Sequence, residues 1–229
     1  MKLSPLVVIG LLGATSLAAQ EETLAFEGFR TLTVSDGLRA RVEIGDTFSV
    51  KTRGIPDDRY AWNITQEGAD LRVGLDFTSD GSLIDMSDRF RIAITMPQLD
   101  QVAAQTGAHL DIIAEELDGI TVEAMTGAGV WLRNVELGDV SLSASTGASV
   151  ELTGECAALA LTATDGGFVD ADDLECLTVV AEARNGGSLR YHAEETASVI
   201  ATGGARVVGM GDGKMQDALV SGGSSFSVR

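Results

Sequence analysis

Hydrophobic and polar residues alternate with a period of two along most of this chain, and residues 126–145 show the pattern clearly. This segment holds two runs in which every second residue is aliphatic: Ala128, Val130 and Leu132, then Val140, Leu142 and Ala144. A period of two is typical of a β-strand that turns one face toward a core and the other toward water. The segment therefore predicts two short strands, with room for a third near 135–137.

A tripeptide with Gly in its middle recurs along the chain at nearly constant spacing. It stands at Thr106-Gly107-Ala108, Thr126-Gly127-Ala128, Thr146-Gly147-Ala148, Asp165-Gly166-Gly167, Asn185-Gly186-Gly187, Thr202-Gly203-Gly204 and Ser221-Gly222-Gly223. The steps between successive tripeptides are 20, 20, 19, 20, 17 and 19 residues. A nearly fixed period of this length is typical of a stack of one repeated unit. Because Gly adopts positive φ readily and the residue before it can bond to nearby backbone, the tripeptide predicts the corner of each unit.

About twenty residues of strand and tight turn complete one circuit, and successive circuits stack ~4.8 Å apart when equivalent strands pair in parallel. We therefore predict an all-β fold, a parallel β-helix (solenoid) of ~20-residue coils with an irregular N-terminal β region. A leucine-rich repeat needs a Leu-rich helical segment and an Asn ladder, which the sequence does not show. A propeller blade needs ~40 residues.

The N-terminus has the pattern of a secretory signal. Lys2 supplies the positive start, Leu6–Leu12 the apolar run, and Ser16–Ala19 a small-residue cleavage site. We predict a signal peptide at 1–19 and a single domain at 24–229, which divides into irregular opening strands at 24–100 and regular coils at 101–229. The apolar run is too short for a membrane span, so we expect no stable span after cleavage. The mature chain is then exported to the periplasm, the cell surface or the medium.

The chain is strongly acidic, with a formal net charge of −18 and a pI of about 4.3. A nucleic-acid partner calls for a basic stripe, and an anionic membrane surface also attracts basic segments, so neither class of partner is predicted. Acidity of this degree favours solubility. It is also compatible with affinity for cations or basic partners.

The only two cysteines, Cys156 and Cys176, each stand nine positions before the next predicted corner. In a stack they are neighbours on adjacent coils, and the expected Cα separation of ~4.8 Å lies within the range of a disulfide. An exported protein meets oxidising conditions. We therefore predict a Cys156–Cys176 disulfide.

One outward column of side chains is the candidate binding surface. Counting five residues onward from each corner gives Asp111, Trp131, Glu151, Asp170, Arg190 and Val207. A solvated mixed face has this composition, and so does a recognition surface. The carboxylates Asp111, Glu151 and Asp170 also allow an alternative, a carbohydrate-active enzyme, because Asp111 and Glu151 would stand ~9.6 Å apart.

No other pattern indicates catalysis, a metal or a cofactor, and we predict none of the three. His109 and His192 would be separated by four coils, or ~19 Å, which is too far for a dyad. Asp170, Asp172 and Asp173 form an acidic cluster, but strand residues converge poorly on a calcium ion.

A second outward surface is nearly free of charge. Its predicted members are Thr121, Ser141, Ser143, Thr162, Thr178 and Ser198. Small and β-branched residues suit strands in any case, but a flat uncharged face in an acidic protein also suits contact with another flat surface. This candidate flat interface raises self-association as a further hypothesis.

The step of 17 residues before Thr202 breaks the regularity. It would place Arg206 in the core column that Val130, Val150 and Val169 occupy. An unpaired charge cannot be buried there without a large free-energy cost. We therefore expect the register to slip, or the helix to begin closing, at the sixth corner.

Residues 24–229 resemble the family of auto-transporter adhesins known as the head GIN domain. The resemblance rests on the opening Phe26-Glu27-Gly28-Phe29, the strand Ile92-Ala93-Ile94-Thr95-Met96-Pro97-Gln98-Leu99, and the Gly-rich corners that follow. It implies an exported β-helical domain and brings no catalytic residues. We therefore expect a non-enzymatic, adhesin-like binding or structural module of the bacterial cell envelope, which recognises a glycan or an envelope protein through an outward sheet face.

Overall fold

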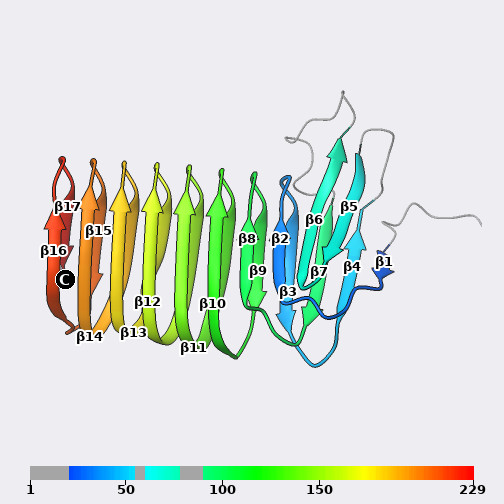
Figure 1. Ribbon diagram of the computed structural model, residues 1–229, viewed down its shortest axis with the longest axis horizontal. Helices are drawn as coiled ribbons and strands as arrows, with labels where there is room; N and C mark the ends of the chain where they lie inside the picture. The colour runs from blue at the N-terminus through cyan, green and yellow to red at the C-terminus, as the bar shows by residue number, and fades with distance from the viewer. Residues whose placement is uncertain (1–20, 55–59, 78–89) are drawn as a thin grey trace, which may run out of the picture.

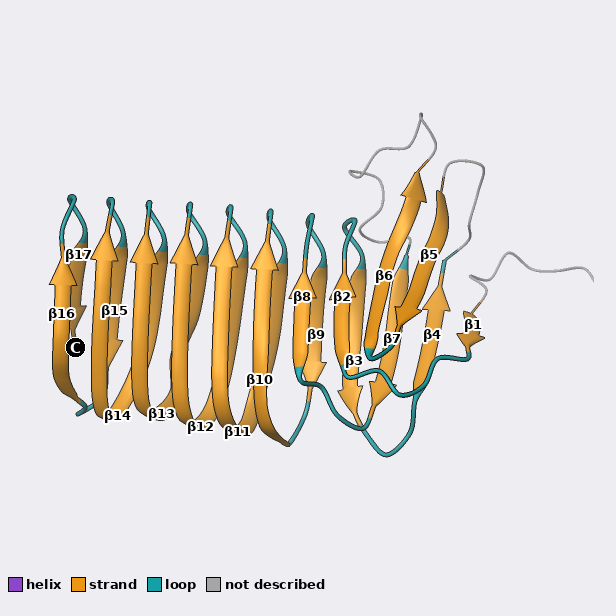
Figure 2. Cartoon of the chain, in the orientation of Figure 1, coloured by secondary structure: helices purple, strands orange, loops and turns teal. Residues whose placement is uncertain are grey.

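A computed structural model describes residues 21–54, 60–77 and 90–229, and their regular secondary structure is entirely β-strand. The chain winds into a flattened solenoid of about six turns with coils of roughly 20 residues, as predicted (Figures 1 and 2). Each coil contributes one strand segment to each of two opposite faces. We name these the column face and the flat face, after the two predicted surfaces that they carry.

The column face continues across the whole length of the solenoid. In spatial order its strands are β1 (Glu21–Leu24), β4 (Ser49–Arg53), β7 (Arg91–Met96), β3 (Arg39–Ile44), β9 (His109–Ile113), the first halves of β11 (Gly129–Ser145), β12 (Ser149–Thr164), β13 (Phe168–Arg184) and β14 (Ser188–Thr202), then β15 (Arg206–Met210) and β17 (Ser225–Val228). Only β4 runs antiparallel to its neighbours here; the other pairings are parallel.

The flat face is built in the same way on the opposite side. Its order is β5 (Tyr60–Glu67), β6 (Asp70–Phe77), β2 (Thr31–Val34), β8 (Gln101–Ala104), β10 (Glu116–Met125), the second halves of β11 to β14, and β16 (Lys214–Val220). β5 pairs antiparallel with β6, whereas the strands from β6 onward pair in parallel. The irregular opening is therefore the first part of the solenoid, closed at its end by antiparallel strands.

The core follows directly from the period of two. The aliphatic residues that alternate along each strand point inward and are buried, for example Val130, Leu132 and Leu142, whose exposed fractions are 0, 0 and 1%. Three aromatic side chains of the core, Phe29, Tyr60 and Phe90, are buried at the N-terminal end, and Tyr191 is buried in β14. The other buried side chains of the regular coils are mainly Ala, Val and Leu.

The corners are tight turns in which two consecutive residues have positive φ. At the first corner φ is 50° for Thr106 and 74° for Gly107, and Ala108 donates a backbone hydrogen bond to the Gln105 carbonyl at 3.0 Å. Two successive left-handed residues are the requirement of a type I′ turn. Asp36 and Gly37 repeat this geometry, so the series of corners begins one coil earlier than the sequence analysis placed it.

The register slips at the sixth corner, as predicted. Arg206 pairs with Ser188 and is exposed, while Val207 pairs with Leu189 and is buried. Our placement of Val207 in the outward column was therefore wrong, because the turn at this corner begins at Gly203 instead of Thr202. A shift of one residue along a strand exchanges its inward and outward side chains, and this shift keeps the Arg206 charge in water.

The predicted signal peptide at 1–19 lies outside the described residues. Within the described part of the chain, no helix is long and apolar enough to cross a membrane.

Candidate functional site

The residues of the candidate binding surface pair in one series on adjacent strands, up to Arg190. Trp131 pairs with Asp111 on one side and with Glu151 on the other, and the series continues through Asp170 to Arg190. Each residue lies on the next strand of the column face, so the column runs along the solenoid axis. At the end of this series Val208 takes the position that we had assigned to Val207.

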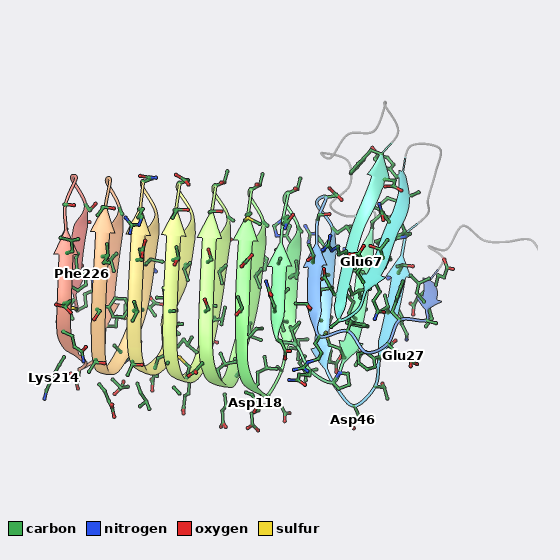
Figure 3. The ribbon with its side chains drawn as sticks, viewed as in Figure 1. Glu27, Asp46, Glu67, Asp118, Lys214 and Phe226 are labelled. Atoms are coloured by element: carbon green, nitrogen blue, oxygen red, sulfur yellow. A yellow bond between two sulfur atoms is a disulfide. The ribbon has the colours of Figure 1, made fainter. Side chains whose placement is uncertain are left out.

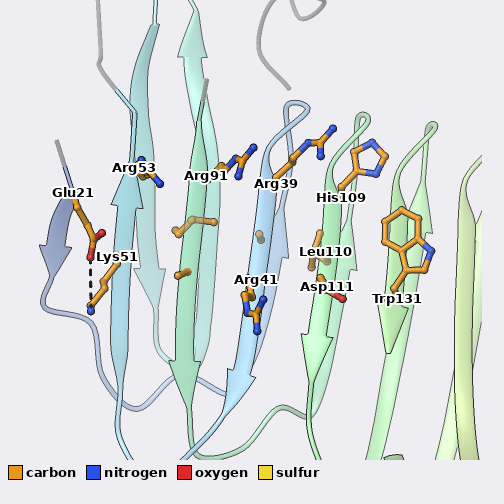
Figure 4. Close-up of a pocket in the computed structure, with 13 residues that line it drawn as sticks. Glu21, Arg39, Arg41, Lys51, Arg53, Arg91, His109, Leu110, Asp111 and Trp131 are labelled. Atoms are coloured by element: carbon orange, nitrogen blue, oxygen red, sulfur yellow. Dashed lines mark ion pairs between the residues drawn. The ribbon is translucent and has the colours of Figure 1, made fainter. Parts of the chain in front are cut away.

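A groove of about 540 Å³ lies at the N-terminal end of this column (Figure 4). Five cationic side chains and two carboxylates line it, together with an imidazole and an indole. They are Arg39, Arg41, Lys51, Arg53, Arg91, Glu21, Asp111, His109 and Trp131. We call this site the arginine groove. The sequence analysis found only Asp111 and Trp131 among these residues as site candidates.

The five cations form two rows because they alternate along paired strands. Arg53, Arg91 and Arg39 pair in series across β4, β7 and β3, and His109 of β9 continues that row. In the second row, Lys51 and Arg41 both pair with Ala93 of β7. All five cationic side chains are exposed. Lys51 forms an ion pair with Glu21 at 3.8 Å.

An aromatic stack closes the groove on the side of the regular coils. The rings of His109 and Trp131 are parallel within 11°, with their centroids 5.6 Å apart. The indole lies over Gly129, the residue that pairs with His109, and a side chain at that position would collide with the ring. Burial, assisted by the positive charge of Arg39, lowers the pKa of His109, so the imidazole is neutral at pH 7.

The acidic cluster lies farther along the column and is partly neutralised by Arg190. This guanidinium contacts the carboxylates of Asp170 and Asp172 at 3.3 and 3.6 Å, and it also lies over the ring of Phe168 at 5.7 Å. Burial first, and then the neighbouring Asp172, raise the pKa of Asp170 to about 6. No group of acidic, His or Cys residues in the described ranges is arranged to hold a metal ion.

The flat face differs from our prediction at Thr178. The outward series reads Thr121, Ser141, Ala160, Val180 and Ser198, and Thr178 pairs with Ala158 in the adjacent series instead. The coils differ in length by a residue or two, and bulges in their first halves absorb the difference. Positions on the flat face are therefore aligned by their distance to the next corner. This face also carries the Arg184–Glu182 ion pair, so it is less uncharged than expected.

The edge opposite the corners combines the disulfide with a series of carboxylates. Cys156 and Cys176 are bonded, with their Cα atoms 4.5 Å apart, which confirms the predicted pairing. Beside them Glu116, Glu136, Glu155 and Glu175 pair in series on adjacent strands, and all four are exposed. Figure 3 shows Asp46 and Asp118 at this same edge. Much of the negative charge therefore lies away from the arginine groove.

Comparison with known families identifies the chain. The model of the family described as "Putative auto-transporter adhesin, head GIN domain" matches residues 28–213. The chain belongs to this family. The match spans both the irregular opening strands and most of the regular coils, which confirms the resemblance noted in the sequence.

Solved structures show the same fold at low sequence identity. A putative adhesin from Bacteroides fragilis superposes with a TM-score of 0.78 at 16% identity, covering 93% of this chain and 98% of that one. A putative adhesin from Parabacteroides merdae gives 0.69 at 15% identity, covering 92% and 95%. A putative lipid binding protein from Parabacteroides distasonis gives 0.63 at 10% identity, covering 92% and 96%. A search of curated proteins finds no relative of this head GIN domain chain.

Proposed function

We propose that this protein is an exported, adhesin-like binding module of the bacterial envelope, and that it holds its partner in the arginine groove of the column face. In this proposal residues 1–19 are removed on export and residues 24–229 form the binding domain. The observation that carries the proposal is the groove itself. Five cations and an aromatic stack line it, although the net charge of the chain is −18. Adhesin family membership supports a role in binding.

The groove has the properties of a recognition site. Its volume of about 540 Å³ lies within the usual range for small-molecule pockets. Strands of the solenoid hold its walls, so the groove requires little ordering of loops when a partner binds. A preformed site loses less conformational entropy on association than a flexible one does.

Binding assays with two matched variants test this proposal. Trp131→Ala removes the wall of the groove, whereas Ser141→Ala makes a small change on the flat face. We expect the purified protein to bind at least one class of ligand on a glycan array or on isolated bacterial envelopes. Trp131→Ala should weaken that binding at least tenfold, and Ser141→Ala should leave it unchanged. Equal binding by the wild type and Trp131→Ala would contradict the proposal.

The raised pKa of Asp170 is the one observation that favours the alternative function, a carbohydrate-active enzyme, since such a shift suits a general acid. The triple variant Asp111→Asn, Glu151→Gln, Asp170→Asn decides between the two functions. Turnover of a polysaccharide by the wild type that disappears in the triple variant would establish the enzyme. Binding without turnover across a panel of polysaccharides supports the adhesin-like module.

A further inference from the structure

The arginine groove presents its cations as a regular array. Arg53, Arg91 and Arg39 stand on three consecutive strands, so their backbones are ~4.8 Å apart from one to the next. Lys51 and Arg41 form a second row on the same face, two residues along their strands; Ala93 lies between them, so their backbones are ~9.6 Å apart. An array of this kind matches a partner whose negative charges also repeat along its length.

The charge of the groove is opposite to that of the molecule. Lys and Arg total 16 residues against 34 Asp and Glu, yet the described residues that line the groove include five cations and two carboxylates. Like charges directly opposite each other on neighbouring strands destabilise a sheet. The row of Arg53, Arg91 and Arg39, which stand directly opposite one another, is therefore unfavourable for folding and favourable for holding an anion.

Arginine also sets the geometry of the contacts. A guanidinium donates two parallel hydrogen bonds to a carboxylate or a sulfate, and it remains charged at any physiological pH. Arg41 and Arg53 extend from the strands into the groove (Figure 4). They are exposed, so an anion reaches them without disruption of the core.

The remaining walls favour a saccharide over a lipid. The residues beneath the cations, Ala40, Ile92 and Leu110, are at most 4% exposed, so the groove opens to no apolar interior that would take an acyl chain. At one end His109 and Trp131 offer aromatic surface. Aromatic side chains combine apolar area with a polar edge and pack well against the C–H faces of sugar rings.

We propose that the arginine groove binds an acidic glycan, a saccharide chain that carries carboxylate or sulfate groups along its length. The anionic groups contact the two rows of cations, and a sugar ring packs against the His109–Trp131 stack. This inference rests on the proposed function and specifies its ligand. The acidic remainder of the chain repels polyanions, which confines their binding to this groove.

Isothermal titration calorimetry of the purified protein tests the inference with defined probes. Polygalacturonate oligosaccharides supply carboxylates, heparin oligosaccharides supply sulfates, and maltooligosaccharides are neutral. Inorganic sulfate and vesicles of phosphatidylglycerol supply anions without a sugar. We expect one or both acidic oligosaccharides to bind, with an affinity that falls as salt concentration rises. The neutral oligosaccharides, free sulfate and vesicles should bind at least tenfold more weakly.

Two double variants with the same change in net charge locate the binding. Arg41→Gln/Arg53→Gln removes two charges from the groove, and we expect it to weaken binding of the acidic oligosaccharide at least tenfold. Arg206→Gln/Lys214→Gln removes two charges from the C-terminal coils and should change it less than twofold. Equal weakening by both variants would overturn the inference, since it would show attraction by net charge alone.

The same experiment separates failure of this inference from failure of the proposed function. Tight binding of maltooligosaccharides that Trp131→Ala abolishes and Arg41→Gln/Arg53→Gln spares would overturn the acidic ligand but keep the groove as the binding site. Binding of phosphatidylglycerol vesicles in preference to every oligosaccharide would identify a lipid surface instead. If none of the probes or isolated envelopes binds, both proposals fail.

Discussion

Loss of the Cys156–Cys176 disulfide should destabilise the solenoid by an amount that can be worked out from its position. The bond joins residues that are 20 apart in sequence and lie on adjacent coils, so it closes a loop of one full coil. In the unfolded chain, closure of a loop of this length removes conformational entropy equivalent to about 3 kcal/mol. Reduction of the bond returns this entropy to the unfolded state and lowers the free energy of unfolding by the same amount.

Burial of both sulfur atoms adds a second contribution in the Cys-free variant. Cys176 is fully buried and Cys156 is 7% exposed, so Cys156→Ala/Cys176→Ala also removes packed side-chain volume. Loss of two small buried groups costs about 1 kcal/mol beyond the entropy. For a chain of this size each kcal/mol lowers Tm by roughly 2–4 °C, so we expect a decrease of about 6–12 °C on reduction and somewhat more in the variant.

Urea unfolding followed by circular dichroism measures both changes, and a thiol titration establishes the redox state of each sample. Reduced wild-type protein is the control for the variant, because it lacks the covalent bond but keeps both sulfur atoms. Oxidised and reduced wild-type protein that unfold within about 0.5 kcal/mol of each other would refute the reasoning. Such a result would mean that the two coils stay together in the unfolded ensemble, so that the bond restricts nothing.

Three further changes test other parts of the structure, each by its effect on the free energy of unfolding. Gly138→Ala should lower the free energy of unfolding by about 3 kcal/mol, because its new Cβ would collide with the Asp118 carbonyl oxygen. Gly127→Ala should lower it by only about 1 kcal/mol, because the space at this corner is open and the cost comes from the positive φ of 72°. Similar losses in the two variants would contradict this account. Asp170→Asn should be more stable than the wild type by a margin that is about 1 kcal/mol larger at pH 7.5 than at pH 4, with solvent screening included. A carboxyl whose pKa is raised from 3.8 to about 6 lowers the free energy of unfolding of the wild type as pH rises through that range, and Asn does not ionise. A difference between the two proteins that does not change with pH would contradict this reasoning. Glu155→Gln should raise stability by about 0.5 kcal/mol at low salt and less at high salt, because it interrupts a series of like charges; no dependence on salt would contradict it.

The regular coils could be predicted from the sequence because a single element, the corner, recurs with Gly at its centre. Its spacing established the parallel pairing of Trp131 with Asp111 and Glu151, and that of Cys156 with Cys176. The slip at Arg206 was also accessible, because a charge in a core column is physically unacceptable. In each case local backbone chemistry and burial point to the same register.

Residue counting failed where coils differ in length. Thr178 was assigned to the outward series of the flat face, but the register shifts between Glu151 and Gly154 and again after Ala171, and Val180 takes that position. A bulge has no residue signature as distinct as a Gly corner. The corner spacing therefore shows that one coil is shorter or longer than the next, but it does not show at which position the bulge lies. Val207 lies in the core instead of the outward column for a different reason, because the turn at the sixth corner begins at Gly203 instead of Thr202.

The arginine groove escaped prediction because its cationic residues come from strands outside the repeat. Arg39 and Arg91 are paired by the parallel contact of β3 with β7, and Arg53 joins them through β4, which runs antiparallel. Nothing in the spacing of the corners encodes these contacts. A usable signal was nevertheless present, since Arg39 and Arg41, and likewise Lys51 and Arg53, are alternate residues on strands of an otherwise acidic chain.

The location of the groove follows from the repeat architecture itself. A regular coil presents nearly the same outward geometry as its neighbours, so depressions of about 540 and 510 Å³ on the regular coils are lined by equivalent positions of successive coils. A groove with a distinct set of side chains requires a departure from the repeat. In this protein the departure occurs where β4 joins the column face antiparallel to β7, and where the indole of Trp131 stands above the bare backbone of Gly129. The boundary between the opening strands and the regular coils is therefore the place where a binding site forms with least change to the core.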